Sequence, residues 1–214
     1  MPLKEVELTI QSKELPAEVR EFLDEADARI SSYYESKAVR PSGFVPSDFV
    51  AVYHALRAIS ESGLSPGHSF CEWGSGFGVV ASLAAMLEFD AYGIEISNEL
   101  VEAARRLADD YSLPVEFVQG SFIPVGSDAL ADEAFAEHQD HVYFLVTESD
   151  HAYTELGLGP DDADIVFAYP WPGEEYAIEG LFENNAAAGA LLLTYNSCES
   201  VRLQRLVLEK SHRR

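Results

Sequence analysis

The sequence Ser-Phe-Cys-Glu-Trp-Gly-Ser-Gly-Phe-Gly at residues 69–78 has the residue types and spacing of a ligand-binding turn. An apolar, strand-like segment that carries Glu72 leads into three glycines at alternate positions, Gly74, Gly76 and Gly78. An apolar helical run follows at once. Glycine has no Cβ, so the backbone of such a turn can approach a ligand closely. The segment therefore predicts a strand, a glycine turn and a helix that bind a nucleotide-like ligand.

The glycine spacing distinguishes two classes of ligand. A dinucleotide fingerprint, G-x-G-x-x-G counted from Gly74, needs its third glycine where this sequence has Val79. The pattern is instead acid-x-G-x-G-x-G, with Glu72 as the acid. An NAD-dependent oxidoreductase is therefore a disfavoured alternative. A further alternative is that the glycines form only a tight turn.

A second acid follows the first at a distance that suits an adenosine ligand. The segment Asp90-Ala-Tyr-Gly-Ile-Glu reads as a strand that ends at Glu95, about 20 residues beyond the first glycine. A carboxylate there can accept hydrogen bonds from both ribose hydroxyls. NAD-binding proteins also use an acid at this place. Glu95 therefore indicates an adenosine-containing ligand but does not distinguish the two ligand classes.

These residues resemble the first motif of the class I S-adenosylmethionine (SAM)-dependent methyltransferases. The resemblance implies that SAM is the cofactor and that Glu72 lies under its amino-acid end. It also implies that the cofactor is bound by Gly74, Ser75, Gly76, Gly78, Glu95, Ile96, Ser121 and Phe122. The family usually has an acid at the place of Ser121 that contacts the adenine amine. Here that contact is expected to be weaker, or to come from Phe122 and the backbone.

The alternation of strands and helices across residues 69–196 predicts an α/β fold, a doubly wound and mostly parallel sheet. We expect strands at 69–73, 90–95, 114–120, 164–170 and 190–196, with a strand-like run at 141–146. We expect helices at 16–32, 48–62, 79–87, 97–111, 127–138 and 175–188. Residues 1–66 are expected to form an N-terminal helical cap or lid and 67–214 the SAM-binding core.

The two ends of the chain are harder to interpret. Residues 6–10 are a candidate short strand. The tail after residue 196 is too short for both the sixth and seventh strands of the common methyltransferase fold, so a shortened C-terminal end is expected. Residues 201–208 have the length for one edge strand or a short helix.

Aromatic residues follow the fourth core strand, where methyltransferases meet the acceptor atom. The sequence Ala168-Tyr-Pro-Trp lacks the acid or amide of enzymes that methylate amino groups of adenine, cytosine or glutamine. It resembles more closely the compact lysine methyltransferases related to mitochondrial enzymes that modify ATP synthase or adenine nucleotide carrier subunits. That resemblance rests on the Phe-Val-Pro loop at 44–48, the glycine turn and Val-Phe-x-x-Pro on the fourth strand. It implies an amine acceptor, with a protein lysine as the first candidate.

Three residues near this strand end are the candidate catalytic residues. Tyr169 and Trp171 would form an apolar channel that disfavours the charged ammonium, and Glu174 would take its proton. The alternative for the two rings is ordinary packing between the strand and the next helix.

The net charge of −23, from 37 acidic and 14 basic residues, bears on partners. Such a field repels phosphate backbones, so a nucleic-acid substrate is disfavoured, whereas a basic protein or a small cationic amine is favoured. Acidity that only confers solubility is an equal alternative. We find no apolar run of about 18 residues and no signal sequence at the N-terminus, so we expect a soluble, cytoplasmic protein without a membrane segment.

Other chemistries have weaker support. His138, His141 and His151 lack a companion acid or cysteine cluster, so no metal site is expected. Cys71 and Cys198 are expected to be free thiols, and no G-x-S-x-G nucleophile elbow occurs. A protein that binds a nucleotide-like ligand without turnover, as a sensor or interaction module, remains an alternative because of Ser121 and the short tail.

Overall fold

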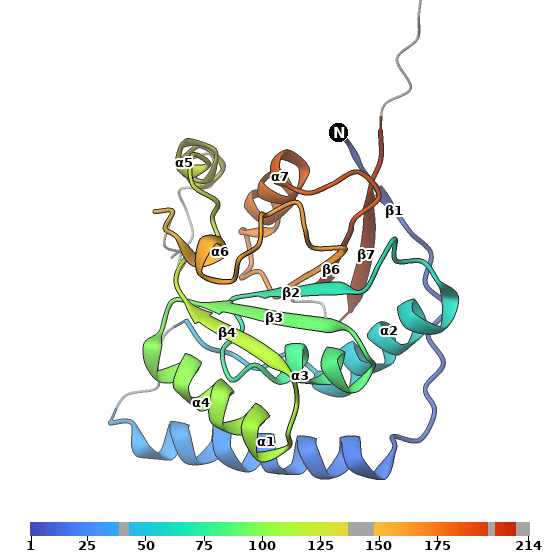
Figure 1. The fold of residues 1–214 in the computed structure, drawn as a ribbon, viewed down its shortest axis with the longest axis vertical. Helices are drawn as coiled ribbons and strands as arrows, with labels where there is room; N and C mark the ends of the chain where they lie inside the picture. Colours follow the sequence, from blue (N-terminus) through green and yellow to red (C-terminus); the bar gives the residue numbers. More distant parts are fainter. Residues whose placement is uncertain (39–42, 137–147, 197–199, 209–214) are drawn as a thin grey trace, which may run out of the picture.

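The computed structural model describes residues 1–38, 43–136, 148–196 and 200–208. Its centre is a seven-stranded sheet with the order β1-β7-β6-β5-β2-β3-β4 (Figure 1). The strands are β1 (Leu3–Glu5), β2 (Ser69–Trp73), β3 (Asp90–Glu95), β4 (Val115–Gln119), β5 (Ile165–Ala168), β6 (Leu191–Tyr195) and β7 (Val201–Leu206).

Helices cover both faces of this sheet. They are α1 (Ala17–Ser36), α2 (Phe49–Ser62), α3 (Val79–Met86), α4 (Asn98–Asp110), α5 (Asp128–Ala136), α6 (Ala152–Glu155) and α7 (Glu175–Asn185). Helices α1 to α4 lie on one face and α5 to α7 on the other (Figure 1). The predicted doubly wound α/β fold is confirmed. The short helix α6 was not predicted, and the strand-like run at 141–146 lies outside the described residues.

The strand order reverses at β2, which fixes where a ligand can bind. β2 pairs in parallel with β3 on one side and with β5 on the other, and β4 and β6 extend the parallel sheet outward. The connections that follow β2 and β5 therefore leave the sheet in opposite directions. In open α/β sheets the crevice at the carboxyl ends of such strands is the usual ligand site.

The expected shortened C-terminal end is confirmed, with one strand after β6, and the N-terminal residues complete the sheet, which corrects two details. β7 is a strand, and it pairs antiparallel with β6 and also with β1, where Leu3 faces Leu206. β7 is therefore not at the edge, and the N-terminal strand lies at residues 3–5 and not at 6–10. Much of β7 is buried: Gln204 is 3% exposed, and Leu206 at the end of the strand is 0% exposed. The division of the chain at residue 66 remains a prediction.

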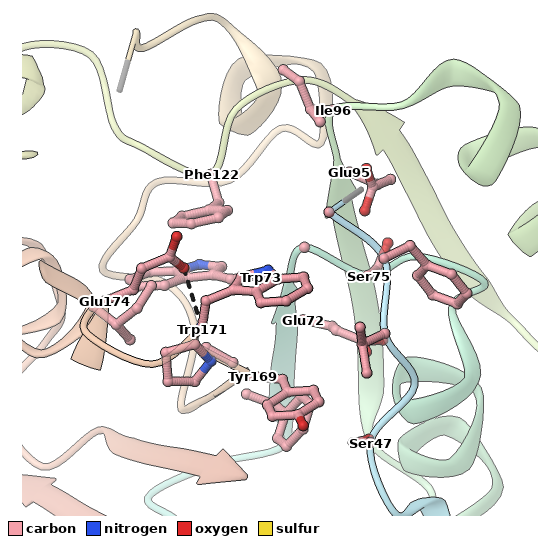
Figure 2. A pocket seen from close by; sticks show the side chains of 18 of the residues that line it. Ser47, Glu72, Trp73, Ser75, Glu95, Ile96, Phe122, Tyr169, Trp171 and Glu174 are labelled. Atoms are coloured by element: carbon pink, nitrogen blue, oxygen red, sulfur yellow. Dashed lines mark hydrogen bonds between the residues drawn. The ribbon is translucent and has the colours of Figure 1, made fainter. Parts of the chain in front are cut away.

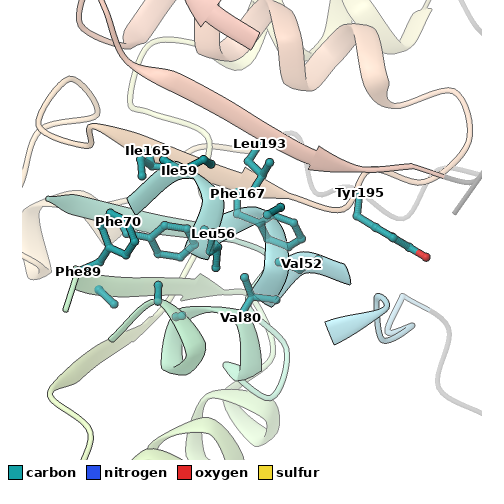
Figure 3. Packing of buried hydrophobic residues seen from close by; sticks show 14 of the residues in the cluster. Val52, Leu56, Ile59, Phe70, Val80, Phe89, Ile165, Phe167, Leu193 and Tyr195 are labelled. Atoms are coloured by element: carbon teal, nitrogen blue, oxygen red, sulfur yellow. The ribbon is translucent and has the colours of Figure 1, made fainter. Parts of the chain in front are cut away.

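Successive residues of a strand contribute to the core on opposite faces of the sheet, as expected for a pleated strand. Phe70 packs with the α2 residues Val52, Leu56 and Ile59 on one face (Figure 3). Its neighbour Cys71 packs with α7 on the other face. Burial raises the pKa of the free Cys71 thiol to about 12, so it is an inert core residue. Cys198 lies outside the described residues.

Local signals set the ends of α2. The Asp48 carboxylate accepts a hydrogen bond from the Ala51 N–H at 2.9 Å, which satisfies a free donor of the first turn. Gly63, with φ of +62°, ends the helix in the left-handed conformation. No helix in the described residues has the length and apolar composition that a membrane span requires.

Candidate functional site

A cavity of about 390 Å³ opens at the carboxyl ends of β2, β3, β4 and β5. Most of the residues predicted from the sequence line it, namely Glu72, Gly74, Ser75, Glu95, Ile96, Ser121, Phe122, Tyr169, Trp171 and Glu174. Glu95 and Ile96 lie on one side, Tyr169, Trp171 and Glu174 on the other, with Trp73 between them (Figure 2). The switch point of the sheet thus brings together residues from four strand ends.

The glycine turn is a compact backbone structure that follows β2. The N–H groups of Gly74 and Ser75 both donate to the Ile94 carbonyl, at 2.9 and 3.0 Å, and the Gly78 N–H donates to the Ser75 carbonyl at 2.7 Å. Gly74 has φ of +70°, in the left-handed region that favours glycine. A Cβ built on Gly74 would meet no atom of the described residues within 4 Å. That open space is where a ligand can touch the backbone.

Gly76 and Gly78, also predicted to bind the cofactor, do not line the cavity. A Cβ on Gly76 would lie 2.5 Å from the ring of Phe44, and one on Gly78 would lie 2.3 Å from the ring of Phe117. These two glycines are required because other side chains pack directly on the turn. They support the site from behind.

Glu72 is a buried acid that holds the start of α3. Its carboxylate accepts the Ala81 N–H at 2.8 Å, and the residue is 5% exposed. The helix N-terminus favours a negative charge there. Burial nevertheless raises the pKa of Glu72 well above its ordinary value, against the opposing effect of the Ala81 hydrogen bond.

Glu95 connects the end of β3 to the glycine turn. One carboxylate oxygen accepts the Gly76 N–H at 2.9 Å and the other accepts the Ser97 N–H at 2.8 Å. The pKa of Glu95 is raised by burial, while hydrogen bonds from the Ser97, Gly76 and Ile96 N–H groups lower it. A carboxylate has about four acceptor positions in all, so this one can still accept a hydrogen bond from a ligand.

An aromatic and apolar wall that also carries the Ser75 hydroxyl adjoins these carboxylates. The rings of Trp73 and Phe122 stack with centroids 5.2 Å apart and planes 7° apart, and Ile96 is 49% exposed at the cavity. The Ser75 hydroxyl is buried and has no hydrogen-bond partner among the described residues. A buried polar group without a partner is costly, so this hydroxyl suits a polar ligand atom.

The opposite wall carries the three candidate catalytic residues. Tyr169 and Trp171 are half-buried, and Tyr169 meets Tyr195 edge to face at 5.2 Å. Glu174 is 3% exposed, and its carboxylate accepts the Trp171 N–H at 3.2 Å. The sequence motif therefore places two rings and one buried acid side by side on the cavity wall (Figure 2).

Residues 43–47 lie over the glycine turn and also line the cavity. The Phe44 ring lies 5.4 Å from Phe77 and 5.9 Å from Tyr34, and the Tyr34 hydroxyl donates to the Phe44 carbonyl at 2.8 Å. The sequence indicated this loop as a lid segment. Apart from the adjacent Tyr33 and Tyr34, nothing in the sequence indicated the aromatic contacts between this loop and α1.

The fold is similar to solved structures of methyltransferases. One is an RNA methyltransferase from Salinibacter ruber in complex with S-adenosyl-L-homocysteine (SAH), with 17% identity, a TM-score of 0.51, and 78% of this chain and 97% of that chain covered. This chain has the Rossmann-like fold of the class I methyltransferases. A methyltransferase from Geobacter sulfurreducens matches with 15% identity, a TM-score of 0.49, and 91% and 92% of the two chains covered.

Other methyltransferase structures are matched over a smaller share of their own length. An O-methyltransferase from Bacillus cereus in complex with SAH matches with 14% identity and a TM-score of 0.49, over 85% of this chain and 66% of that one. Against two further methyltransferases the chain spans about half, 54%, of their length. No protein-family model and no curated protein matches the sequence.

No group of three or more His, Cys, Asp or Glu side chains in the described ranges is arranged to hold a metal ion. His138 and His141 lie outside those ranges. The sequence did not single out several other wall residues of this cavity, among them Trp73 and Phe77. Each of these two residues stands next to a glycine of the turn.

Proposed function

We propose that this protein is a SAM-dependent methyltransferase that transfers a methyl group to an amine. The observation that carries the proposal is the arrangement of two anchored carboxylates, Glu72 and Glu95, around an open glycine turn at the switch point of the sheet. The methyltransferase fold supports it.

The residues of this site fit SAM. Gly74 leaves open space beside the backbone, and the Glu95 carboxylate can still accept a hydrogen bond from a ribose hydroxyl. The Ser75 hydroxyl has no hydrogen-bond partner in the part of the chain that the structure describes. Trp73, Phe122 and Ile96 supply apolar surface for a planar base. SAM carries a sulfonium-bound methyl group, which it supplies as the electrophile when bound. Nearby carboxylates and aromatic rings favour its positive charge.

The cavity wall favours a cationic or neutral acceptor over an anionic one. Among the described residues that line it, none is Lys, Arg or His, whereas the acids Glu95 and Glu174 are present. A phosphate-bearing acceptor would meet repulsion there and no charged hydrogen-bond donor. An amine would enter a site whose charges suit it.

A lysine acceptor is the finer part of the proposal. Its ammonium must lose a proton before it can attack, which costs about 4–5 kcal/mol at pH 7 from a reference pKa near 10.4. Tyr169 and Trp171 disfavour the ammonium by excluding water, and the Glu174 carboxylate lies beside Trp171 to take the proton. The net charge of −23 would attract a basic protein partner.

The experiment is a calorimetric titration of SAM and SAH into the purified protein and into Glu95→Ala. Glu99→Gln is the matched control, because Glu99 is an exposed acid that pairs with Lys37 outside the cavity. We expect micromolar binding by the wild type and the control and its loss in Glu95→Ala. Transfer is then assayed with labelled SAM and basic proteins, with the modified residue identified by mass spectrometry.

Each part of the proposal can fail separately. Absence of binding at millimolar SAM would overturn it entirely, and a larger thermal shift with NAD than with SAM would favour an oxidoreductase. Binding with no transfer to basic proteins or small amines would favour a sensor. Transfer to RNA would overturn the amine acceptor alone.

A further inference from the structure

Helix α7 presents one face to the cavity, and the side chains of that face change along the helix. Glu174, at the N-cap, and Ile178 both line the cavity, and both are 3% exposed. The Ile178 N–H donates to the Glu174 carbonyl at 3.0 Å, so the two side chains lie one turn apart on the same face. Phe182, one turn further, is fully buried and does not line the cavity. On this helix the cavity therefore ends at Ile178.

The direction of α7 places Ile178 deeper in the molecule than Glu174. The strands β5 and β6 are parallel, so α7, which connects them, runs back from the carboxyl ends of the strands toward their amino ends. Four residues of a helix advance by about 6 Å. A group that enters from the carboxyl ends of the strands and reaches the Glu174 carboxylate therefore has Ile178 about one helical turn beyond it.

The other walls of this deep end are large side chains that pack on one another. Trp73 lines the cavity at the end of β2, and its ring is stacked with Phe122 at 5.2 Å. The Phe182 ring of α7 meets Trp73 edge to face, with centroids 6.4 Å apart. Trp171 and Pro172 line the cavity from the loop that precedes α7. A well-packed wall of this kind has little room for an extra methyl group.

We infer that Ile178 is a specificity-determining residue that limits the size of the substituents on the acceptor nitrogen. The inference rests on the proposed function, because it requires an amine whose nitrogen reaches Glu174. In the transfer, this nitrogen forms a bond to the methyl carbon while the carbon–sulfur bond breaks, SAH leaves, and the surplus proton of the nitrogen passes to Glu174. A methyl group that the nitrogen already carries needs space beyond Glu174, and the Ile178 side chain fills that space. Primary amines are therefore favoured over N,N-dimethylated amines.

The test compares two amines that carry the same charge and differ only at the nitrogen. n-Butylamine, which matches the lysine side chain, and N,N-dimethyl-n-butylamine are both ammonium ions at pH 7. Each is titrated by NMR into the SAH complex of the wild type, Ile178→Ala and Leu181→Ala. Leu181 is the matched control, because it is a buried aliphatic residue of α7 that does not line the cavity. The ratio of the two affinities within one variant does not depend on the fraction of protein that is folded.

We expect the wild type and Leu181→Ala to bind n-butylamine more tightly by about tenfold or more, the effect of a small change in size in an apolar pocket. Ile178→Ala opens space beyond Glu174, so the preference should fall to about one or reverse. Equal binding of the two amines by the wild type would overturn the inference. An unchanged preference in Ile178→Ala, or the same fall in Leu181→Ala, would also overturn it. A wild type that does not bind SAH, or whose SAH complex binds neither amine, would instead overturn the proposed function.

If Ile178→Ala fails to fold, Ile178→Val provides the second test, because it removes one methyl group and costs less stability. The preference for n-butylamine should then fall by about fourfold, the equivalent of one buried CH₂ group. Mass spectrometry of the transfer products gives a further readout. With SAM, either Ile178 variant should add more methyl groups to one n-butylamine nitrogen than the wild type does. Equal numbers of methyl groups would contradict the inference.

Discussion

The Glu95 carboxylate accepts the backbone N–H of Gly76 at 2.9 Å, which joins the end of β3 to the turn that follows β2. The same turn donates two N–H groups back to the Ile94 carbonyl. The acid and the turn therefore form one hydrogen-bonded unit, and neither can move without the other. A ligand that binds the acid would find the turn already in position, which lowers the entropic cost of binding.

The first prediction concerns the charge of that acid. Glu95→Gln keeps an acceptor oxygen but removes the negative charge, so SAH affinity should fall by about 10- to 100-fold. Equilibrium dialysis with labelled SAH measures the effect. Glu99→Gln, outside the cavity, should bind as the wild type does. Equal affinity of Glu95→Gln and Glu99→Gln would show that Glu95 has only a structural role.

The second prediction separates two glycines of the turn. Gly74→Ala and Gly76→Ala should each lose about 1–2 kcal/mol of folding free energy, because both have positive φ. Gly76→Ala should lose more, since its methyl group would collide with the Phe44 ring. In a Phe44→Ala background that extra loss should disappear, while the cost of Gly74→Ala should not change.

Urea denaturation of the three single and two double variants measures these effects. SAH affinity gives a second readout, because the methyl group introduced by Gly74→Ala would enter open space in the cavity. We expect Gly74→Ala to lose SAH binding while it remains folded. A Gly76→Ala cost that is equal in both backgrounds would contradict the contact with Phe44.

Local signals predicted much of this site and fold. Gly74 and its neighbours, the cap at Asp48 and the strand that ends at Glu95 are encoded by residues close together in the chain. Periodicity and capping chemistry act over such short distances. The turn, the acid and most helix bounds could therefore be predicted before the structure was known.

Contacts between distant segments could not be predicted in this way. β1 has only three residues, and its pairing with β7 joins positions about 200 residues apart, as Leu3 and Leu206 show. A strand of this kind is specified by its partner, because strand propensity depends on context. Asp150, whose carboxylate accepts the Ser121 N–H at 2.7 Å, is a similar case. Nothing in its local sequence indicates that the absence of a Cβ at Gly120 lets it reach β4.

The third prediction concerns the aromatic wall on the acceptor side. Trp171→Ala should leave SAH affinity within about threefold of the wild type, since Glu95 and the glycine turn lie on the opposite side of the cavity (Figure 2). The rate of methyl transfer to an amine should fall by about tenfold or more, because misplaced reactants lose rate steeply. Single-turnover transfer with labelled SAM measures this rate.

The control for this effect is Tyr176→Ala, since Tyr176 is an aromatic residue of α7 that is 67% exposed and does not line the cavity. It should transfer at the wild-type rate. A loss of SAH binding in Trp171→Ala as large as its loss of rate would place Trp171 on the cofactor side of the site, contrary to the proposal.

The fourth prediction follows from the raised pKa of Glu72. Burial keeps this carboxyl protonated in the folded protein at pH values where the unfolded chain, with an ordinary pKa of 4.5, has released the proton. The folded state therefore binds more protons, and its stability falls as pH rises from about 4.5 toward the raised pKa. Glu72→Gln has no proton to release, and its oxygen can still accept the Ala81 N–H. Relative to the wild type, the free energy of unfolding of Glu72→Gln should thus increase as pH rises, by about 1.4 kcal/mol for each pH unit over which only the folded wild type stays protonated.

Urea denaturation of the ligand-free proteins between pH 4 and pH 8 measures this difference, with Glu116→Gln, an exposed site on β4, as the control. At each pH, the free energy of unfolding of Glu72→Gln is compared with that of the wild type. This difference is needed because the net charge of −23 itself destabilises the folded state as carboxylates ionise. A difference between Glu72→Gln and wild type that stays constant over this range would mean that Glu72 is ionised throughout. In that case the α3 N-terminus and the Ala81 hydrogen bond would outweigh the cost of burying the charge.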